Sequence, residues 1–416
     1  MTTPPAAPSG PVADAAPGAR VWTPWRVVVG FGTVSLAADM VYEGARSVYG
    51  PLLASLGASA VVVGAVTGAG EAAALIFRVL SGPLADRTRR YWALTITGYA
   101  LTAVCVPLLA VTPFLGAAGL AVAAVLILAE RLGKAVRSPA KSALLADAAA
   151  QVGMGRGLGV HKALDQIGAF AGPLVVAGLV ALTGVLWPAL AALAVPGAVA
   201  MVLLVVTRRR LPEPEPAVGP TAAEPDAGRV HRPLPASFFG FAIGTTICTA
   251  GLVTFGLISF SLVQRHVVPT AVVPLLYAGA MAAGAVAALL TGEVYDRWGA
   301  RVLLALPVLV AAVPALAFGG SMALVLPGVL LWGAAVGVQD STVKALVADL
   351  VPRDRRATAY GFFAAVQGAG ALIGGIGAGA LYDHSVSALV TVIAASQVAA
   401  FLVIVPVVRR ARASAA

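Results

Sequence analysis

The chain has 416 residues, of which 59% are hydrophobic and only 11% are charged, and its mean hydropathy is +0.92. Soluble domains carry about 25% charged residues, so this composition excludes a water-soluble core and predicts a protein that lies in a lipid bilayer. The formal net charge of +10 comes from arginines that are spread over many connecting segments without stacking aromatics, which argues against a nucleic-acid partner.

The apolar residues form runs of roughly 20, the length at which one helix crosses about 30 Å of hydrocarbon. The two-residue alternation typical of membrane β-barrels is missing from these runs. The sequence therefore predicts an all-α integral membrane protein.

Residues 1–20 are rich in proline and alanine and lack the basic segment and apolar core of a signal peptide. We expect a disordered cytoplasmic tail there. An N-terminal six-helix bundle is predicted over 21–210, with spans at approximately 27–54, 59–81, 91–114, 117–141, 157–182 and 185–207.

Residues 211–235 combine Pro, Glu and Arg, which suits a flexible cytoplasmic linker and not a membrane span. A second six-helix bundle is predicted over 236–410, followed by a cytoplasmic tail at 411–416. Its spans run at approximately 237–263, 269–291, 301–319, 322–345, 358–382 and 386–408.

Basic residues set the expected orientation, because cytoplasmic loops carry an excess of Lys and Arg. With the N-terminus inside, the inner loops and tails hold nearly all of the loop arginines, and the outer loops hold only Arg265. We therefore predict a multi-pass protein of the cytoplasmic membrane with both termini in the cytoplasm. We expect a monomer.

The two halves repeat each other in the same direction. The segment SPAKSALLAD, which ends at Asp147, is similar to DSTVKALVAD, which ends at Asp349. Each closes the fourth span of its half. Parallel repeats are typical of transporters whose halves are related by an axis along the membrane normal, with the substrate between them near the midplane.

A second pair of repeated segments carries a family resemblance. The loop after the second span contains Gly82, Leu84, Asp86, Arg87 and Arg90, and its copy after the eighth span contains Gly292, Asp296, Arg297, Gly299 and Arg301. This pattern resembles the loop motif of the major facilitator superfamily. The resemblance covers nearly the whole chain and implies a secondary transporter with twelve transmembrane helices in two pseudo-symmetric bundles. Arg89 departs from the pattern, since the family usually has a glycine there.

The loop motif suggests a conformational latch. Glycine lets helix ends approach closely, an aspartate can lie against the positive N-terminal end of a neighbouring helix, and arginines pair with acidic groups or lipid phosphates. We expect this role for Gly82, Asp86, Arg90, Gly292, Asp296 and Arg301. The alternative is that these residues only end a helix and follow the positive-inside bias.

Ionisable groups inside the spans are costly and normally face a cavity or a partner. The third, sixth, ninth and twelfth spans, taken as 92–113, 186–207, 302–319 and 387–408, have none. The resemblance implies that these four helices face lipid, while the first, fourth, seventh and tenth line the cavity. We expect substrate or proton-coupling roles for Asp39, Glu43, Arg46, Glu71, Lys134, Arg137, Lys141, Asp165, Asp340 and Lys344. The alternative is a set of fixed ion pairs between helices. His161 is interpreted as a solvated histidine.

In the fifth span, Gly168, Gly172 and Pro173 resemble the glycine and proline motif of proton-coupled antiporters in this superfamily. Small residues let helices pack closely, and proline leaves a backbone hydrogen bond unmade, which gives a place to bend. Close helix packing alone would also explain these residues.

The leading hypothesis is proton-driven antiport, with efflux of a small organic compound by alternating access. Proton-coupled symport of an anionic solute is the alternative, favoured by the basic side chains Lys134, Arg137 and Lys141 on one helix face. Metal-ion export and a transport-inactive sensor are weaker hypotheses. We find no catalytic or metal-site motif and no phosphate-binding loop, so we expect neither an enzyme nor a cofactor. Buried charge is concentrated in the N-terminal half, so the C-terminal half is expected to form apolar surroundings for the cargo.

Overall fold

The computed structural model describes residues 22–211, 234–351 and 355–413. Within these ranges it contains twelve helices that are long and apolar enough to cross a membrane, and no strand. The predicted all-α class and the predicted number of spans are thus confirmed. The predicted tails and linker fall almost entirely outside the described residues.

The first half is built from eight α-helices and two short 3₁₀ segments. In chain order they are α1 (Pro24–Arg46), α2 (Tyr49–Ser55), α3 (Ala60–Thr88), α4 (Tyr91–Leu108), η1 (Leu109–Phe114), η2 (Gly116–Ala118), α5 (Gly119–Val152), α6 (Met154–Thr183), α7 (Trp187–Ala192) and α8 (Ala194–Arg210).

The second half repeats this order with fewer interruptions. Its elements are α9 (Ala236–Gly251), α10 (Phe255–Gln264), α11 (Val272–Trp298), η3 (Gly299–Leu304), α12 (Ala305–Ala317), α13 (Met322–Leu350), α14 (Arg356–His384) and α15 (Val386–Ala413).

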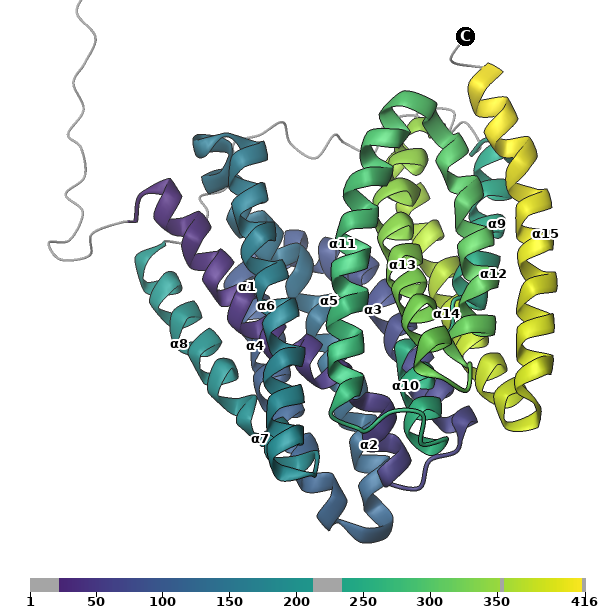
Figure 1. The fold of residues 1–416 in the computed structure, drawn as a ribbon. Coiled ribbons are helices and arrows are strands. Elements are labelled where there is room, and N and C mark those ends of the chain that lie inside the picture. Colours follow the sequence, from purple (N-terminus) through teal and green to yellow (C-terminus); the bar gives the residue numbers. More distant parts are fainter. Residues whose placement is uncertain (1–21, 212–233, 352–354, 414–416) are drawn as a thin grey trace, which may run out of the picture.

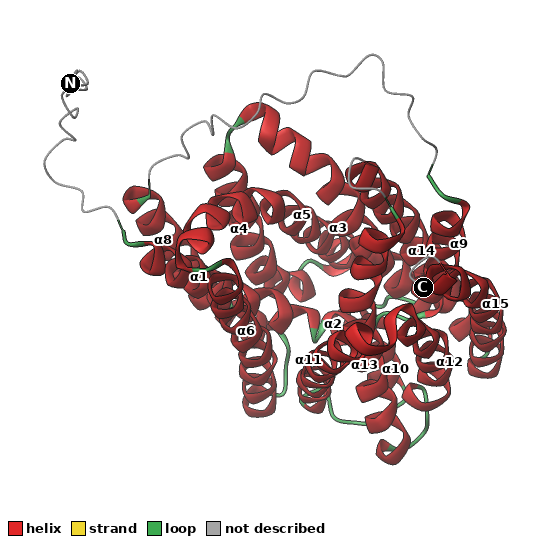
Figure 2. Ribbon diagram, turned by 90° about the horizontal axis from the view of Figure 1, so that it is seen from above, coloured by secondary structure: helices red, strands yellow, loops and turns green. Residues whose placement is uncertain are grey.

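The two halves stand side by side, with α1 to α8 on one side and α9 to α15 on the other (Figures 1 and 2). The start of α1 and the ends of α8 and α15 all lie at the upper edge in Figure 1, which we call the terminal face. The other end of the bundle is the opposite face. An even number of spans brings both ends of each half to the same side.

The first span of each half is broken near the opposite face. In the first half the break separates α1 from α2 at Ser47 and Val48. In the second half it separates α9 from α10, and the hydroxyl of Thr254 caps the new helix by accepting from the Leu257 amide at 3.3 Å. The shared break shows that the repeat extends to local backbone geometry.

The halves meet most closely where α3 runs along α14. A Cβ atom at Gly64 or at Gly375 would clash with the carbonyl of the other residue, so only glycine allows this approach. At the opposite face, the Asp383 carboxylate at the end of α14 accepts from the amides of Ala60 and Val61 at 3.3 and 3.2 Å. It thereby caps the first turn of α3 from the other half.

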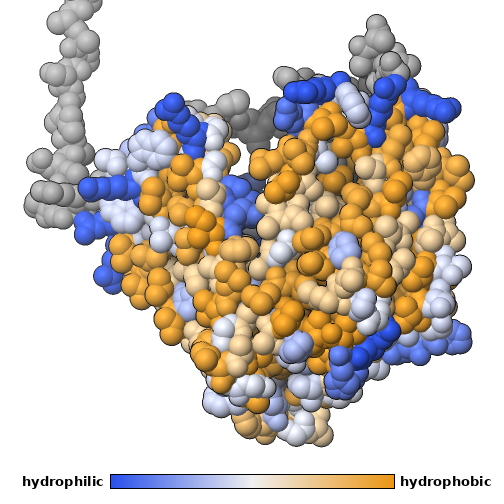
Figure 3. All heavy atoms as spheres, in the orientation of Figure 1, coloured by the Kyte–Doolittle hydropathy of each residue, from blue (hydrophilic) through white to orange (hydrophobic). Residues whose placement is uncertain are grey.

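A recess lined by hydrophilic residues separates the halves toward the terminal face, in a surface that is otherwise largely hydrophobic (Figure 3). At the opposite face the gap is closed, because α2 packs on α10 with Gly50 against the backbone of Gly256. The structure is thus open toward the terminal face.

Candidate functional site

Three charged side chains of α1 lie on one helix face near the middle of the first span. They are only partly accessible: the side chains of Asp39, Glu43 and Arg46 are 12%, 10% and 22% exposed. The face points toward α3 and α5, where their charged partners lie. The spacing of four and three residues explains why one helix face carries all three.

Glu71 of α3, the second span, forms ion pairs with one arginine of the first span and one of the fourth. One oxygen of its carboxylate, Oε1, lies 2.5 Å from Nη2 of Arg46 and 3.2 Å from Nη2 of Arg131 on α5. Two guanidinium groups therefore share a single carboxylate oxygen. The Glu71 side chain is 31% exposed, whereas that of Arg131 is 4% exposed, so the pair spans the edge of the recess.

Tyr42 of α1 lies at the centre of the cationic side chains. Its hydroxyl accepts a hydrogen bond from Nη1 of Arg131, and the ammonium of Lys134 lies 3.4 Å from its ring centroid. The Arg131 guanidinium carbon is 4.9 Å from the same centroid. The electron-rich ring thus stabilises positive charge that the carboxylates alone do not cover.

Arg131 and Tyr42 were not among the predicted site residues. Arg131 lies next to Glu130 in the sequence, whereas Glu130, Lys134 and Arg137 recur at intervals of four and three residues and share one helix face. The prediction considered that face and therefore missed Arg131. The available signal was simpler: any arginine inside an apolar run requires a partner.

Glu43 connects the two halves. Its Oε2 accepts a hydrogen bond from the hydroxyl of Tyr277 on α11, and its Oε1 lies 3.9 Å from Nζ of Lys134. Tyr277 is held by aromatic packing, with Phe255 at 4.7 Å and Trp332 at 6.3 Å between ring centroids. A carboxylate of the first half is therefore hydrogen-bonded to a tyrosine that belongs to an aromatic cluster of the second half.

Arg137 and Asp39 form a second cluster closer to the terminal face. Nη2 of Arg137 lies 3.9 Å from Oδ1 of Asp39, and Nη1 donates to the hydroxyl of Thr102. The guanidinium also lies over the ring of Tyr99, 4.4 Å from its centroid. Lys141 donates to the hydroxyl of Ser35 at 3.0 Å, so all three predicted basic residues of α5 contact α1 or α4.

α6 adds a carboxyl group to this cluster. The carboxylate of Asp165 accepts from Nζ of Lys162 at 2.5 Å and lies near enough to Asp39 for the two acidic groups to interact electrostatically. The interpretation of His161 as a solvated histidine is wrong, because this residue is only 8% exposed and its Nε2 lies 3.1 Å from the hydroxyl of Ser35.

The predicted hinge residues of α6 bring it close to α1. A Cβ atom at Gly168 would clash with the Leu36 carbonyl, and one at Gly172 would clash with the Met40 carbonyl. Pro173 is buried in the same helix. This close approach is what sets Asp165 beside Asp39.

Replacement of Gly168 by valine is expected to prevent this packing. The added atoms meet the backbone of α1 and not a flexible side chain, so the helices must separate. Gly178→Val is the matched control, since nothing lies within 4 Å of a Cβ at that position. We expect the yield of monodisperse protein on size-exclusion chromatography to fall several-fold for Gly168→Val only. Equal yields would contradict the packing role.

The predicted latch residues lie at the terminal face. Asp86 accepts from the hydroxyl of Tyr91 at 3.1 Å, a contact within its own loop. Arg89 ends α3 with a left-handed φ of 53°, and Gly299 in the second copy has φ of 61°. The turn therefore requires the conformation that glycine adopts most easily, which explains why Arg89 is unusual there.

Among the described residues, Gly82, Arg90, Gly292 and Arg301 form no hydrogen bond or ion pair with the opposite half. Arg90 and Arg301 are exposed, and Gly82 and Gly292 are half-buried. A Cβ at Gly82 would find only Pro139, at 4.0 Å. The side chain of Asp296 lies outside the described residues.

The second half presents a neutral polar cluster to the same region. The Gln339 amide on α13 donates to the Thr249 hydroxyl at 3.0 Å and to the Gln367 carbonyl oxygen at 3.3 Å. In the internal repeat, Gln339 occupies the position of Arg137. The second half therefore does not form only apolar surroundings: it carries an amide cluster where the first half carries an ion pair. Asp340 is exposed beside it, and the side chain of Lys344 lies outside the described residues.

A comparison with protein families agrees with this architecture. The model described as Major Facilitator Superfamily matches residues 31–268 and 241–415, which together cover most of the chain. The chain belongs to the major facilitator superfamily. It is accordingly a multi-pass membrane protein and a secondary transporter that takes a small-molecule substrate.

Relatives of this superfamily member are found in mycobacteria. It is 50% identical over 386 residues to an uncharacterized protein of Mycobacterium tuberculosis, with 91% of this chain and 92% of the relative covered. An uncharacterized protein of Mycobacterium bovis matches with the same figures. An uncharacterized MFS-type transporter of Methanocaldococcus jannaschii is 28% identical over 142 residues, or 34% of each chain.

Solved structures of transporters share the fold. A mutant of the nucleoside transporter NupG matches with a TM-score of 0.73 at 14% identity, covering 92% of this chain and 99% of that one. A bacterial homologue of the human lysosomal transporter Spinster, in an inward-facing and unoccupied conformation, has a TM-score of 0.68 at 14% identity, with 94% and 97% covered. At these identities the likeness is one of fold, and it identifies no cargo.

Proposed function

We propose that this superfamily member is a proton-coupled antiporter that exports a small organic compound across the cytoplasmic membrane by alternating access. The bundles at 21–210 and 236–410 act as the two moving units. The observation that carries the proposal is the charged network on α1, α3, α5 and α6, whose members lie inside helices long and apolar enough to span the membrane. Charge at this depth is retained where it serves a transport pathway.

The terminal face is proposed to be cytoplasmic. The loops there carry Arg87, Arg89 and Arg90, whereas the loop at 265 to 271 on the opposite face carries a single arginine. With this orientation the recess opens to the cytoplasm and the structure is inward-facing. Asp86 is then released from the second half, while Asp383 holds the outer side closed.

Asp39 and Asp165 are proposed to carry the exchanged proton. Two neighbouring carboxylates repel each other, so a proton on one of them stabilises the pair. Glu71 differs, because two guanidinium groups neutralise it in a fixed ion pair. We therefore propose that Glu71 has a structural role, as part of a fixed ion pair between helices, and does not carry the exchanged proton.

Antiport is favoured over the alternatives by the α1–α6 contact. Gly168 and Gly172 place the proposed proton pair at a bend-capable segment of α6, so that a change in helix packing can open or close access to it. Symport of an anionic solute is the second candidate, supported by Lys134, which is 26% exposed at the recess. Metal export has less support, since no group of three metal-binding side chains occurs among the described residues.

Flux in proteoliposomes tests the proposal. Vesicles that contain the purified protein and hold an imposed proton gradient are mixed with a library of small organic compounds while a pH dye reports proton movement. We expect a subset of compounds to move against the proton flow. Asp39→Asn and Asp165→Asn should lose this coupled flux by at least about tenfold, or about 1.4 kcal/mol in the barrier.

Glu293→Gln is the control, since the one ion pair of this exposed carboxylate among the described residues is with Arg297 one turn away, outside the network. Cargo that moves in the same direction as protons would establish symport instead. Unchanged coupled flux in both asparagine variants would exclude the carboxyl pair as the proton site.

A further inference from the structure

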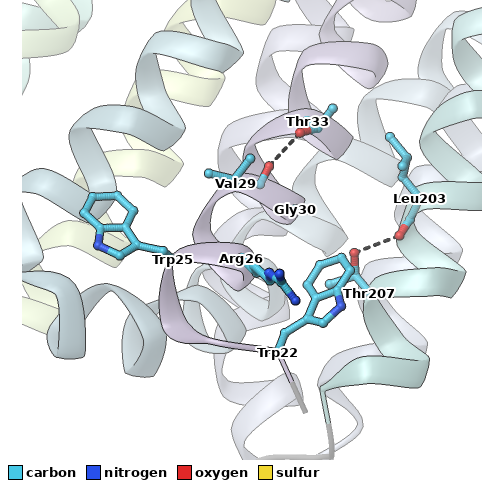
Figure 4. Close-up of a pocket in the computed structure, with 8 residues that line it drawn as sticks. All are labelled: Trp22, Trp25, Arg26, Val29, Gly30, Thr33, Leu203 and Thr207. Carbon is cyan, nitrogen blue, oxygen red and sulfur yellow. Dashed lines mark hydrogen bonds between the residues drawn. The ribbon is translucent and has the colours of Figure 1, made fainter. Parts of the chain in front are cut away.

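A pocket lies far from the charged network, at the terminal-face end of the first and sixth spans (Figure 4). Its volume is about 540 Å³, and it lies between the first turns of α1 and the last turns of α8. The lining residues are Trp22, Trp25, Arg26, Val29, Gly30, Thr33, Leu203 and Thr207. Both helices are membrane spans, so the pocket lies where hydrocarbon gives way to the lipid headgroups.

The polar side chains of its walls are already satisfied. The hydroxyl of Thr33 donates to the Val29 carbonyl and that of Thr207 to the Leu203 carbonyl, each at 2.7 Å, as the dashed lines in Figure 4 show. Each hydroxyl proton is therefore used within its own helix. An occupant meets mainly apolar wall with one cationic group, Arg26.

The indole of Trp22 forms a fitted part of this wall. Its Cζ3 atom would lie only 2.5 Å from a Cβ at residue 30, so the ring rests on α1 because Gly30 has no side chain. The Trp22 amide also donates to the Arg210 carbonyl at 3.4 Å, which ties the start of α1 to the end of α8. Tryptophan is enriched at this depth, where an amphipathic ring meets both environments.

Positive charge gathers around the pocket mouth. Arg26 is exposed on α1, and Arg208, Arg209 and Arg210 are exposed in the last turn of α8. The part of the chain that the structure describes shows no ion pair for these four arginines. Of the four, Arg26 lines the pocket itself, and the other three lie in the last turn of the helix that forms its second wall, so Arg26 offers its positive charge directly to an occupant.

We propose that this pocket binds an anionic phospholipid, with the phosphate at Arg26 and the adjoining arginines and the first part of an acyl chain against Val29, Leu203 and Trp22. A free anion would gain nothing from the apolar walls. A lipid without net charge would leave the arginines less well compensated. Only an amphiphile with a negative headgroup matches both surfaces, since basic residues near the membrane surface attract anionic lipid.

Lipid binding is measured on the purified full-length protein by native mass spectrometry, with phosphatidylglycerol and phosphatidylcholine in competition. We expect wild-type protein to prefer phosphatidylglycerol, and Arg26→Gln to reduce that preference at least about fivefold, or about 1 kcal/mol. Arg156→Gln is the matched control, because it removes the same charge from an exposed position on the same face. It should leave the preference unchanged.

A second variant, Leu203→Trp, narrows the apolar wall while every arginine stays in place, and it should also weaken retention of phosphatidylglycerol. Equal effects of Arg26→Gln and Arg156→Gln would overturn the proposal and indicate general surface attraction. Full displacement of the lipid by inorganic phosphate would also overturn it, since a free-anion site would then explain the binding. These measurements use no transported compound, so they stand whether or not proton coupling does.

Discussion

Arg131→Met is expected to lower the free energy of unfolding by about 3 kcal/mol, the low end of the cost of breaking a buried ion pair. The change leaves the Tyr42 hydroxyl and the carboxylate of Glu71 without a buried partner. We expect the low end of that range because Glu71 keeps Arg46 at 2.5 Å and is 31% exposed. Thermal unfolding of the purified protein in detergent measures the loss.

A double-mutant cycle separates the ion pair from loss of packing. If the two groups interact directly, Arg131→Met combined with Glu71→Gln should cost less than the sum of the single changes. Arg297→Met serves as the surface control. Its pair with Glu293 is exposed, 72% and 65% for the two side chains, and should contribute under about 1 kcal/mol. Strict additivity for Arg131 and Glu71 would show that their contact carries no stabilisation.

Glu43 lies one helical turn from Asp39 on α1, and we propose that it takes part in the same proton exchange as Asp39 and Asp165. Glu43→Gln is therefore expected to separate cargo exchange from the proton gradient. Glutamine keeps the shape of the side chain and can still accept from Tyr277, but it neither gains nor loses a proton. Gradient-driven flux should fall at least about tenfold, while exchange between vesicle sides of equal pH persists. The measurement compares the two rates in the same proteoliposomes, with the compound that gives the strongest wild-type exchange.

Tyr277→Phe is the matching variant on the other side of this bond. It removes the hydrogen bond between the halves and leaves the Glu43 carboxyl in place with Lys134 at 3.9 Å. We expect it to change the exchange rate and to preserve coupling to the gradient. If Tyr277→Phe lost coupling while Glu43→Gln kept it, the hydrogen bond between Tyr277 and Glu43, and not the carboxyl group of Glu43, would be essential for coupling.

The fold was predictable because hydrocarbon imposes a minimum length on each span. The first predicted span, 27–54, matches α1 and α2 together, which run from Pro24 to Ser55. The break inside that span was not predicted. Pro51 is a signal for the break, because a proline cannot donate to the carbonyl four residues earlier, here that of Ser47. The prediction did not use that signal, and the contact of α2 with α10 fixes the new direction of the helix.

The site was predictable only as far as charge reveals it. Asp39, Glu43 and Glu71 stand out because a carboxylate in an apolar run is costly. Tyr277 and Gln367 do not, since a tyrosine or glutamine costs much less in the same place and occurs there for many reasons. Their roles appear only when α11 and α14 are placed against the other helices, which no local pattern specifies.

The contact between α3 and α14 bears on how fast the two halves can change places. Backbone lies on backbone at Gly64 and Gly375, so no side chains interlock there, and Ile76 packs against Gly368 farther along the same two helices. The hydrogen bonds described between α3 and α14 are the two that the carboxylate of Asp383, an exposed residue, accepts. Each of these bonds contributes about 1 kcal/mol at most. The α3–α14 contact therefore resists rolling only weakly, and the contacts that hold the two halves in this state lie elsewhere, at the Glu43–Tyr277 hydrogen bond and the packing of α2 on α10.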